Sequence, residues 1–236
     1  MRIRQYLVSL LFTALLVAPS LAHDTWVEPN TNLVRVGDVV HVNLMLGNHG
    51  NHHRDFKLAG KVDPQHIRLE LIEPDGRRTD LKPRLYDLGT ESNPAYWTVR
   101  IQPEQPGVHR VVCLGDEIVH YAPIRSIKSA KTFFIASESL DEVPAAEAGF
   151  DEPEGHPLEL ILKTDPTVLA AGQPIQVQLL YQGQPLEDTR VSFIPRGVPL
   201  QGEFDERYER MTGEQGLASL TPEQANIYLI VAHHED

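Results

Sequence analysis

His23 is the residue of this 236-residue chain whose setting most directly suggests chemistry. Two arginines, the mostly apolar residues 7–18 and the small residues Ser20 and Ala22 precede it, which is the pattern of a secretory signal peptide and its cleavage site. Cleavage after Ala22 would leave His23 with a free α-amine beside its imidazole. The amine and Nδ1 together could then chelate a divalent metal near neutral pH, because the metal displaces the proton of the amine. The alternative is that His23 follows the cleavage site by chance.

Three more histidines lie together in the segment GNHGNHH, namely His49, His52 and His53. Glycine and asparagine allow such a loop to adopt many conformations, and imidazole nitrogen is a suitable ligand for nickel, cobalt, copper or zinc. His120, at the end of an expected strand, is a further candidate ligand. The sequence therefore predicts a metal site formed by His23 and these four histidines. A polar hairpin loop whose histidines bind nothing is the alternative.

Charge and cysteine content limit the classes of partner. The formal net charge is −12, which disfavours nucleic acid as a partner. The apolar surroundings of the single cysteine, Cys113, favour a buried, unreactive thiol. Arg125, Lys128 and Lys131 indicate a solvated basic loop, with binding of an anion or acidic partner as the alternative. No segment after residue 22 is long and apolar enough to span a membrane, so we expect the mature chain in the periplasm or outside the cell.

Alternation of apolar and polar residues dominates the first half of the mature chain. Apolar residues occupy every second position in 40–46, 67–71 and 97–101, and clusters of Gly, Pro, Asn and Asp separate such segments. This pattern predicts short antiparallel strands with one buried face each, as in a β-sandwich of the immunoglobulin-like class. Three histidines fall on the polar phase of these strands and are expected in solvent: His41, His66 and His109.

The second half begins after an acidic segment. Residues 137–155 contain seven acidic residues and no basic one, which predicts a solvated linker or a loosely packed connection. The strands expected after it resemble a small transthyretin-like or carboxypeptidase-regulatory-like β-sandwich, which would normally have one more edge strand after the last one visible here. The predicted fold is therefore all-β, with two antiparallel sandwiches. The divisions are a signal peptide at 1–22, a sandwich with the metal site at 23–136, the linker at 137–155 and a second sandwich at 156–236.

Three segments resemble a family of exported bacterial proteins. They are AHDTWVEP, VRVGDVVHVNLMLGNHG and the stretch from HPLELILKTDP to QVQLLYQGQPL. The opening motif of that family pairs a histidine and an aspartate with a tryptophan and a Glu-Pro pair; here Thr25 replaces the usual aromatic residue before Trp26. Family members are described as periplasmic components of cobalt and nickel uptake. The resemblance implies a two-domain β-sandwich protein that handles a transition metal outside the cytoplasm.

These observations favour a periplasmic protein that binds nickel, cobalt or copper and is not an enzyme, with a membrane metal transporter as a candidate partner. A second hypothesis is a copper-dependent oxidase or polysaccharide monooxygenase built on an N-terminal histidine brace. The low aromatic content, 7%, counts against it because a glycan platform needs exposed aromatic rings. A third hypothesis is a structural or adhesion module in which both sandwiches only present surfaces.

Overall fold

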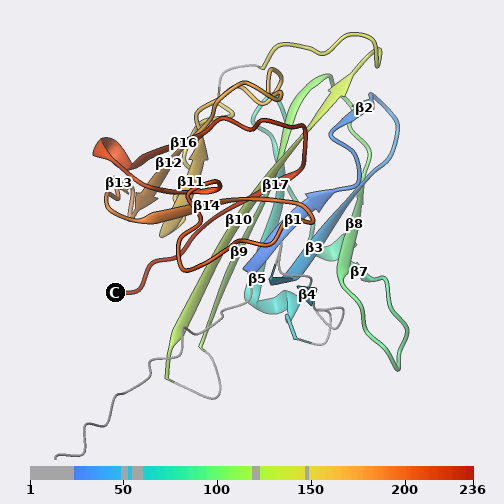
Figure 1. Cartoon of the computed structure of the whole chain (residues 1–236). Coiled ribbons are helices and arrows are strands. Elements are labelled where there is room, and N and C mark those ends of the chain that lie inside the picture. The colour runs from blue at the N-terminus through green and yellow to red at the C-terminus, as the bar shows by residue number, and fades with distance from the viewer. Residues whose placement is uncertain (1–23, 49–52, 55–60, 119–122, 147–148) are drawn as a thin grey trace, which may run out of the picture.

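The protein is all-β, and a computed structural model describes residues 24–48, 53–54, 61–118, 123–146 and 149–236 (Figure 1). In these residues the only helices are three 3₁₀ turns, Pro64–His66, Lys82–Arg84 and Glu214–Gly216. No helix in the described ranges has the length and apolar character that crossing a membrane requires. The strands form four sheets, two from the N-terminal half and two from the C-terminal half. We call these pairs the N-terminal and C-terminal sheets.

The N-terminal sheets each contain five strands. The first has the order β1 (Asp24–Pro29), β3 (Val40–Asn48), β8 (Trp97–Ile101) and β7 (Tyr86–Asp87), with β4 (His53–Arg54) pairing to the end of β3. The second has the order β2 (Leu33–Arg35), β10 (Arg125–Ser137), β9 (Gly107–Ile118), β5 (Ile67–Ile72) and β6 (Arg78–Asp80). Strand pairing is antiparallel as predicted, except that β2 runs parallel to β10.

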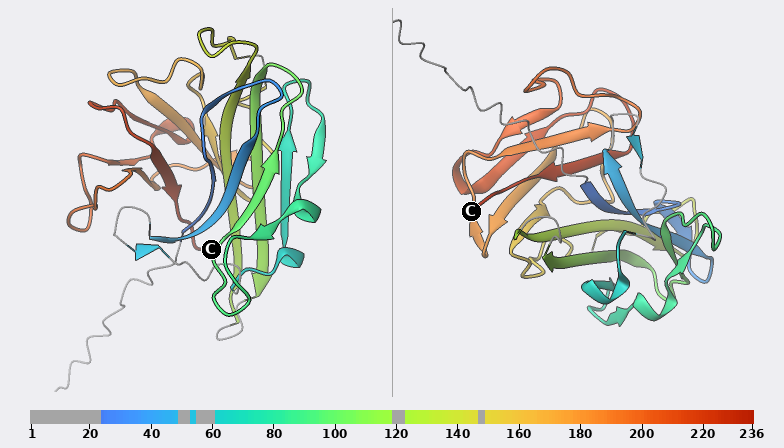
Figure 2. Two further views of the ribbon diagram at one scale, coloured as in Figure 1. Left: turned by 90° about the vertical axis from the view of Figure 1, so that its right-hand side faces the viewer. Right: turned by 90° about the horizontal axis from the view of Figure 1, so that it is seen from below.

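The C-terminal sheets are smaller, as Figure 2 shows. One contains β11 (Leu158–Leu162), β12 (Ile175–Tyr181), β13 (Gln184–Pro185) and β16 (Leu217–Leu220). The other has the order β15 (Glu209–Met211), β14 (Arg190–Pro195) and β17 (Tyr228–Ala232). Each pair of sheets has its own apolar cluster, which we call the first core and the second core.

The predicted alternation is confirmed in the first core. Val40, Val42, Leu44 and Leu46 of β3 are all buried there, because side chains at every second position of a strand point to the same face. Cys113 also lies in this core, 2% exposed, and burial raises the pKa of its thiol to about 12. The prediction of an unreactive cysteine is therefore confirmed.

Strand β10 connects the two cores. Its residue Phe134 lies in the first core, and the adjacent Phe133 packs against the second, because neighbouring side chains on a strand point to opposite faces. The basic loop predicted for residues 125–131 is wrong, since this segment is the first half of β10. Lys131 lies on the same face as Phe133, and its side chain is only 9% exposed. The lysine therefore points toward the C-terminal sheets.

The solvent position predicted for His109 is also wrong. His66 is exposed as expected, but His109 is 0% exposed and stacks on Phe134 with ring centroids 4.8 Å apart. His109 shares a strand face with Val111 and Cys113, so the period of two directs it inward with them. Burial lowers the pKa of its imidazole, which favours the neutral form.

Candidate functional site

Most of the predicted metal ligands lie outside the described residues. This applies to His23, His49, His52 and His120, while His53 is described only as part of the backbone of β4. In the described part of the chain, no group of three or more His, Cys, Asp or Glu residues is arranged to hold a metal ion. The predicted site is thus neither confirmed nor contradicted.

The backbone next to these histidines is described. Asp24 of β1 pairs with Gly47 of β3, and Asn48, the next residue of β3, pairs with His53 of β4. Thr25 lines a small cavity of about 30 Å³ together with residues 115–117 near the end of β9. The Oγ1 of Thr25 is buried and has no hydrogen-bond partner in the described residues. The start of β1 and the ends of β3 and β9 therefore lie at one end of the first core.

The opening motif also makes contacts that its sequence did not indicate. Asp24, Trp26 and Glu28 share one face of β1. Asp24 Oδ1 lies 3.0 Å from Nε2 of His233, and Glu28 Oε1 lies 2.7 Å from Nη2 of Arg196, both residues of the C-terminal half. The Trp26 Nε1–H donates to Oε2 of Glu28 at 3.1 Å. The motif therefore joins β1 to the C-terminal sheets, and its period of two was the available signal.

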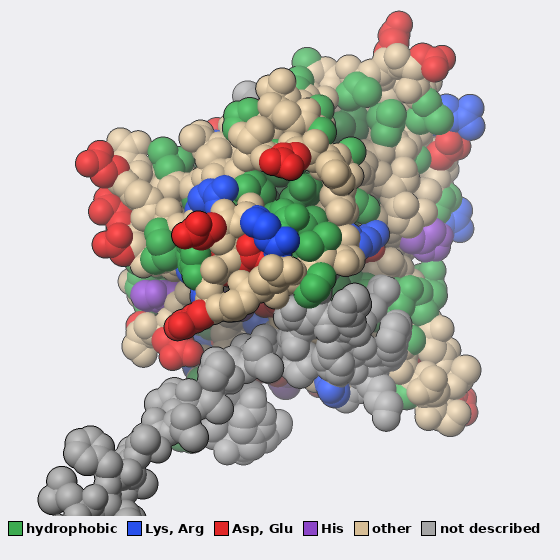
Figure 3. All heavy atoms as spheres, in the orientation of Figure 1, with side chains coloured by type: hydrophobic (Ala, Val, Ile, Leu, Met, Phe, Trp, Pro, Cys, Tyr) green, Lys and Arg blue, Asp and Glu red, His purple; other side chains and the backbone are tan. Residues whose placement is uncertain are grey.

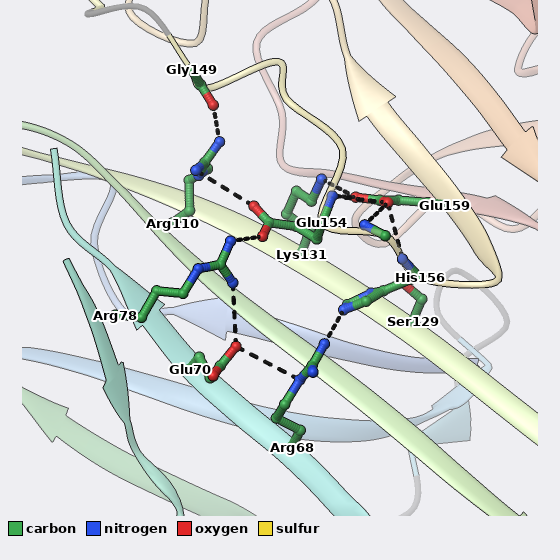
Figure 4. A network of polar contacts seen from close by, with 11 residues as sticks. Arg68, Glu70, Arg78, Arg110, Ser129, Lys131, Gly149, Glu154, His156 and Glu159 are labelled. Carbon is green, nitrogen blue, oxygen red and sulfur yellow. Dashed lines mark hydrogen bonds and ion pairs between the residues drawn. The ribbon is translucent and has the colours of Figure 1, made fainter. Parts of the chain in front are cut away.

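A buried polar network occupies the contact between the N-terminal and C-terminal sheets (Figure 4). The carboxylate of Glu154, whose side chain is 1% exposed, forms an ion pair at 2.5 Å with Arg78 of β6 and one at 3.5 Å with Arg110 of β9. Arg110 also donates to the carbonyl of Gly149. The expectation of a fully solvated acidic segment is wrong at Glu154, because two arginines of the N-terminal sheets neutralise it.

Lys131 and Glu159 form a second buried ion pair of the network, with Nζ and Oε1 2.7 Å apart and the Glu159 side chain 2% exposed. The carboxylate of Glu159 also accepts backbone N–H groups from Glu154, Gly155 and His156. Burial opposes ionisation of Glu159, but the charge of Lys131 and these donors outweigh it, so its pKa lies below the ordinary value. The pair joins β10 to β11 as a fixed charged contact.

His156 is buried beside this pair, although its sequence context carried no pattern. Its Nε2 lies 3.3 Å from Nη2 of Arg68, and its Nδ1 lies 2.6 Å from Oγ of Ser129. Arginine can only donate, so Nε2 is the acceptor and Nδ1–H donates to Ser129. Burial is the main cause of a lowered pKa, and Arg68 and Lys131 lower it further against the opposing effect of Glu159 and Glu154. The neutral form of His156 is therefore favoured in the folded protein.

We expect His156→Gln to reduce the loss of stability in mild acid. A folded-state pKa below the ordinary value of about 6.5 means that the unfolded chain binds the proton more readily, so stability falls as pH drops below about 6.5. Urea unfolding between pH 7 and pH 5 measures this slope. His66→Gln, at an exposed position, is the matched control and should leave the slope unchanged. An unchanged slope in His156→Gln would show that the folded protein accommodates the proton at no cost.

Comparisons with known proteins give a family and a distant structural likeness. A family model, "Domain of unknown function (DUF4198)", matches residues 20–236. No curated protein matches the chain significantly. A solved structure of the Yersinia pseudotuberculosis adhesin InvE is similar at 12% identity and a TM-score of 0.24, over 89% of this chain and 58% of the adhesin chain. The chain therefore spans less than two thirds of that adhesin, and a likeness of this extent implies nothing about function.

Proposed function

The chain belongs to the DUF4198 family, and from the histidine that follows the signal-peptide pattern and from the histidine-rich loop we propose that it is an exported protein that binds nickel, cobalt or copper. The ligands are the α-amine and imidazole of His23, joined by His49, His52 and His53, with His120 as a further ligand. Residues 1–22 are the signal peptide that directs the chain to the periplasm. A membrane metal transporter is the partner that would receive the metal.

One observation supports this proposal most directly. Asp24, the residue that follows His23, pairs with Gly47, and His53 pairs through its backbone with the neighbouring Asn48. The β1 and β4 segments next to the proposed ligands are therefore beside the same end of β3. Strands in a sheet are about 4.8 Å apart, so β1 and β4, which flank β3 on opposite sides, are about 10 Å apart. Side chains that extend toward each other from the two segments could bind one ion across that separation.

The two-domain organisation is part of the same proposal. An immunoglobulin-like sandwich at 23–136 and a transthyretin-like sandwich at 156–236, joined by 137–155, are supported by the two separate apolar clusters. The contacts made by Glu154 and Lys131 would hold the two sandwiches in a fixed relation. Metal binding would then occur on a rigid scaffold, which lowers the cost of ordering the ligands.

The proposed ligands make metal binding dependent on pH. Each imidazole must be unprotonated to bind, so affinity should fall steeply between about pH 7 and pH 5. Calorimetric titration with nickel, cobalt and copper at both pH values measures this. His49→Ala should weaken binding about tenfold or more at pH 7, whereas His234→Ala, an exposed histidine outside the set, should not. Equal affinity in His49→Ala and the unchanged protein would exclude His49 from the site.

A further inference from the structure

Two of the edge strands, β1 and β17, line one cavity, and each has one edge without a strand partner in the described residues. β1 pairs only with β3, and β17 pairs only with β14. The start of β1 meets the end of β17 through Asp24 and His233, and Glu28 near the end of β1 meets Arg196. The N–H of Arg196 bonds the carbonyl of Ile227, directly before β17. The two strands therefore run side by side in opposite directions (Figures 1 and 2).

A cavity of about 720 Å³ is lined by both strands. This volume falls within the range of about 300–1,000 Å³ that is typical of ligand pockets. The face of β10 that carries Ile127 and Phe133 also lines it. β17 is wholly apolar in sequence, yet all five of its residues are only partly buried. In Figure 3, hydrophobic side chains gather in the region where β17 and β1 lie in Figure 1.

The hydrogen-bond alternation of antiparallel strands identifies which groups of β17 face the open edge. Phe193 of β14 donates its N–H to Tyr208, on the side of β15. Its neighbours Ser192 and Ile194 therefore face β17 and pair with Val231 and Leu229. The backbone N–H and C=O groups of the alternate residues remain on the free edge: Tyr228, Ile230 and Ala232.

The same reasoning applies to β1. Asn30 donates its N–H to the carbonyl of His41, so the even-numbered residues of β1 bond to β3. Thr25 and Val27 present their backbone groups to the other edge, and Pro29, which has no N–H, occupies the last position there. Two rows of backbone donors and acceptors thus flank a cavity whose lining is mostly apolar but includes Lys131 and Glu159.

We propose that this cavity binds an extended segment of a partner polypeptide, with apolar residues at alternate positions, as a strand between β1 and β17. An extended backbone supplies donors and acceptors at the spacing of both edges, which a compact small molecule cannot match along two strands. Apolar side chains of the added strand would cover Phe133 and Ile127. The proposal is independent of the metal site.

The test uses the full chain and the peptide acetyl-Lys-Thr-Val-Thr-Val-Thr-Val-Thr-Lys-amide. Hydrogen exchange should slow at the free-edge amides, by about tenfold when the peptide concentration is about ten times Kd. These amides belong to Thr25, Val27, Tyr228, Ile230 and Ala232. The same peptide methylated at its three valine amides and at the two threonine amides between them should not slow exchange, because alternate amides of a strand face opposite neighbours. Ile230→Pro removes one free-edge donor and should weaken binding, whereas Ile230→Val should not.

Three results would overturn the proposal. The first is no slowing at peptide concentrations on the order of 1 mM, where even weak strand addition is measurable. The second is equal slowing by the methylated peptide, which would indicate an apolar ligand site without strand pairing. The third is slowing that grows with protein concentration in the absence of peptide, which would assign the edge to a second copy of this chain. The peptide comparison holds even if Ile230→Pro does not fold.

Discussion

Adding one alanine before His23, in a chain that otherwise starts at His23, should weaken the binding of copper or nickel about tenfold or more. The extension keeps the imidazole but moves the free α-amine to another residue, so the chelate of amine and Nδ1 is lost. The amine has an ordinary pKa near 8 and binds metal at neutral pH only when it is adjacent to a second ligand. Calorimetric titration of both chains at pH 7 measures the difference in Kd.

A chain that begins at Asp24 is the control for this comparison. It lacks the imidazole as well as the chelating amine and should bind at least as weakly as the alanine-extended chain. If the alanine-extended chain binds as tightly as the chain starting at His23, the amine is not a ligand. The binding site would then have to be built from internal histidines alone.

Lys131→Met should reduce the free energy of unfolding by about 3–5 kcal/mol, because it leaves the carboxylate of Glu159 buried without its cation. Urea unfolding followed by circular dichroism measures this loss. Lys163→Met is the matched control: Lys163 pairs with Asp151 at 2.8 Å, but the two side chains are 31% and 40% exposed, so the loss should stay below about 1 kcal/mol.

The double variant Lys131→Met with Glu159→Gln separates pairing from packing. It removes both charges, and the amide oxygen of the glutamine can still accept the backbone N–H groups that Glu159 binds, so most of the stability lost in Lys131→Met should return. A double variant as unstable as Lys131→Met alone would mean that the aliphatic chain of Lys131, and not its charge, joins β10 to β11. Packing of this aliphatic chain against the C-terminal sheets would then contribute more to the free energy of unfolding than the ion pair does.

The strands of this protein follow from the sequence, whereas the contacts between its sheets do not. The alternation at Val40, Val42 and Leu44 predicts β3 and its buried face, because local patterning decides which side chains point inward. The burial of Lys131 and Glu154 depends on partners distant in the chain, and their charge suggested solvent. His109 was predictable, since it shares the phase of Val111 and Cys113.

The candidate metal site is a sequence prediction whose ligands mostly lie outside the described residues. Chelation by His23 would depend on a covalent event, the proposed removal of residues 1–22, that no folding pattern encodes. Convergence of the proposed ligands would depend on the register of β1, β3 and β4, which the spacing of His49 and His53 did not predict. The role of Asp24 and Glu28 at the contact with the C-terminal sheets required the tertiary structure.

The most direct test of the proposed function is metal analysis of the protein recovered from the periplasm after export, combined with sequencing of its N-terminus. The proposal predicts a chain that begins at His23 and contains nickel, cobalt or copper in stoichiometric amount. A chain that begins at His23, is recovered without chelators and contains none of these metals would contradict the proposed metal-binding function.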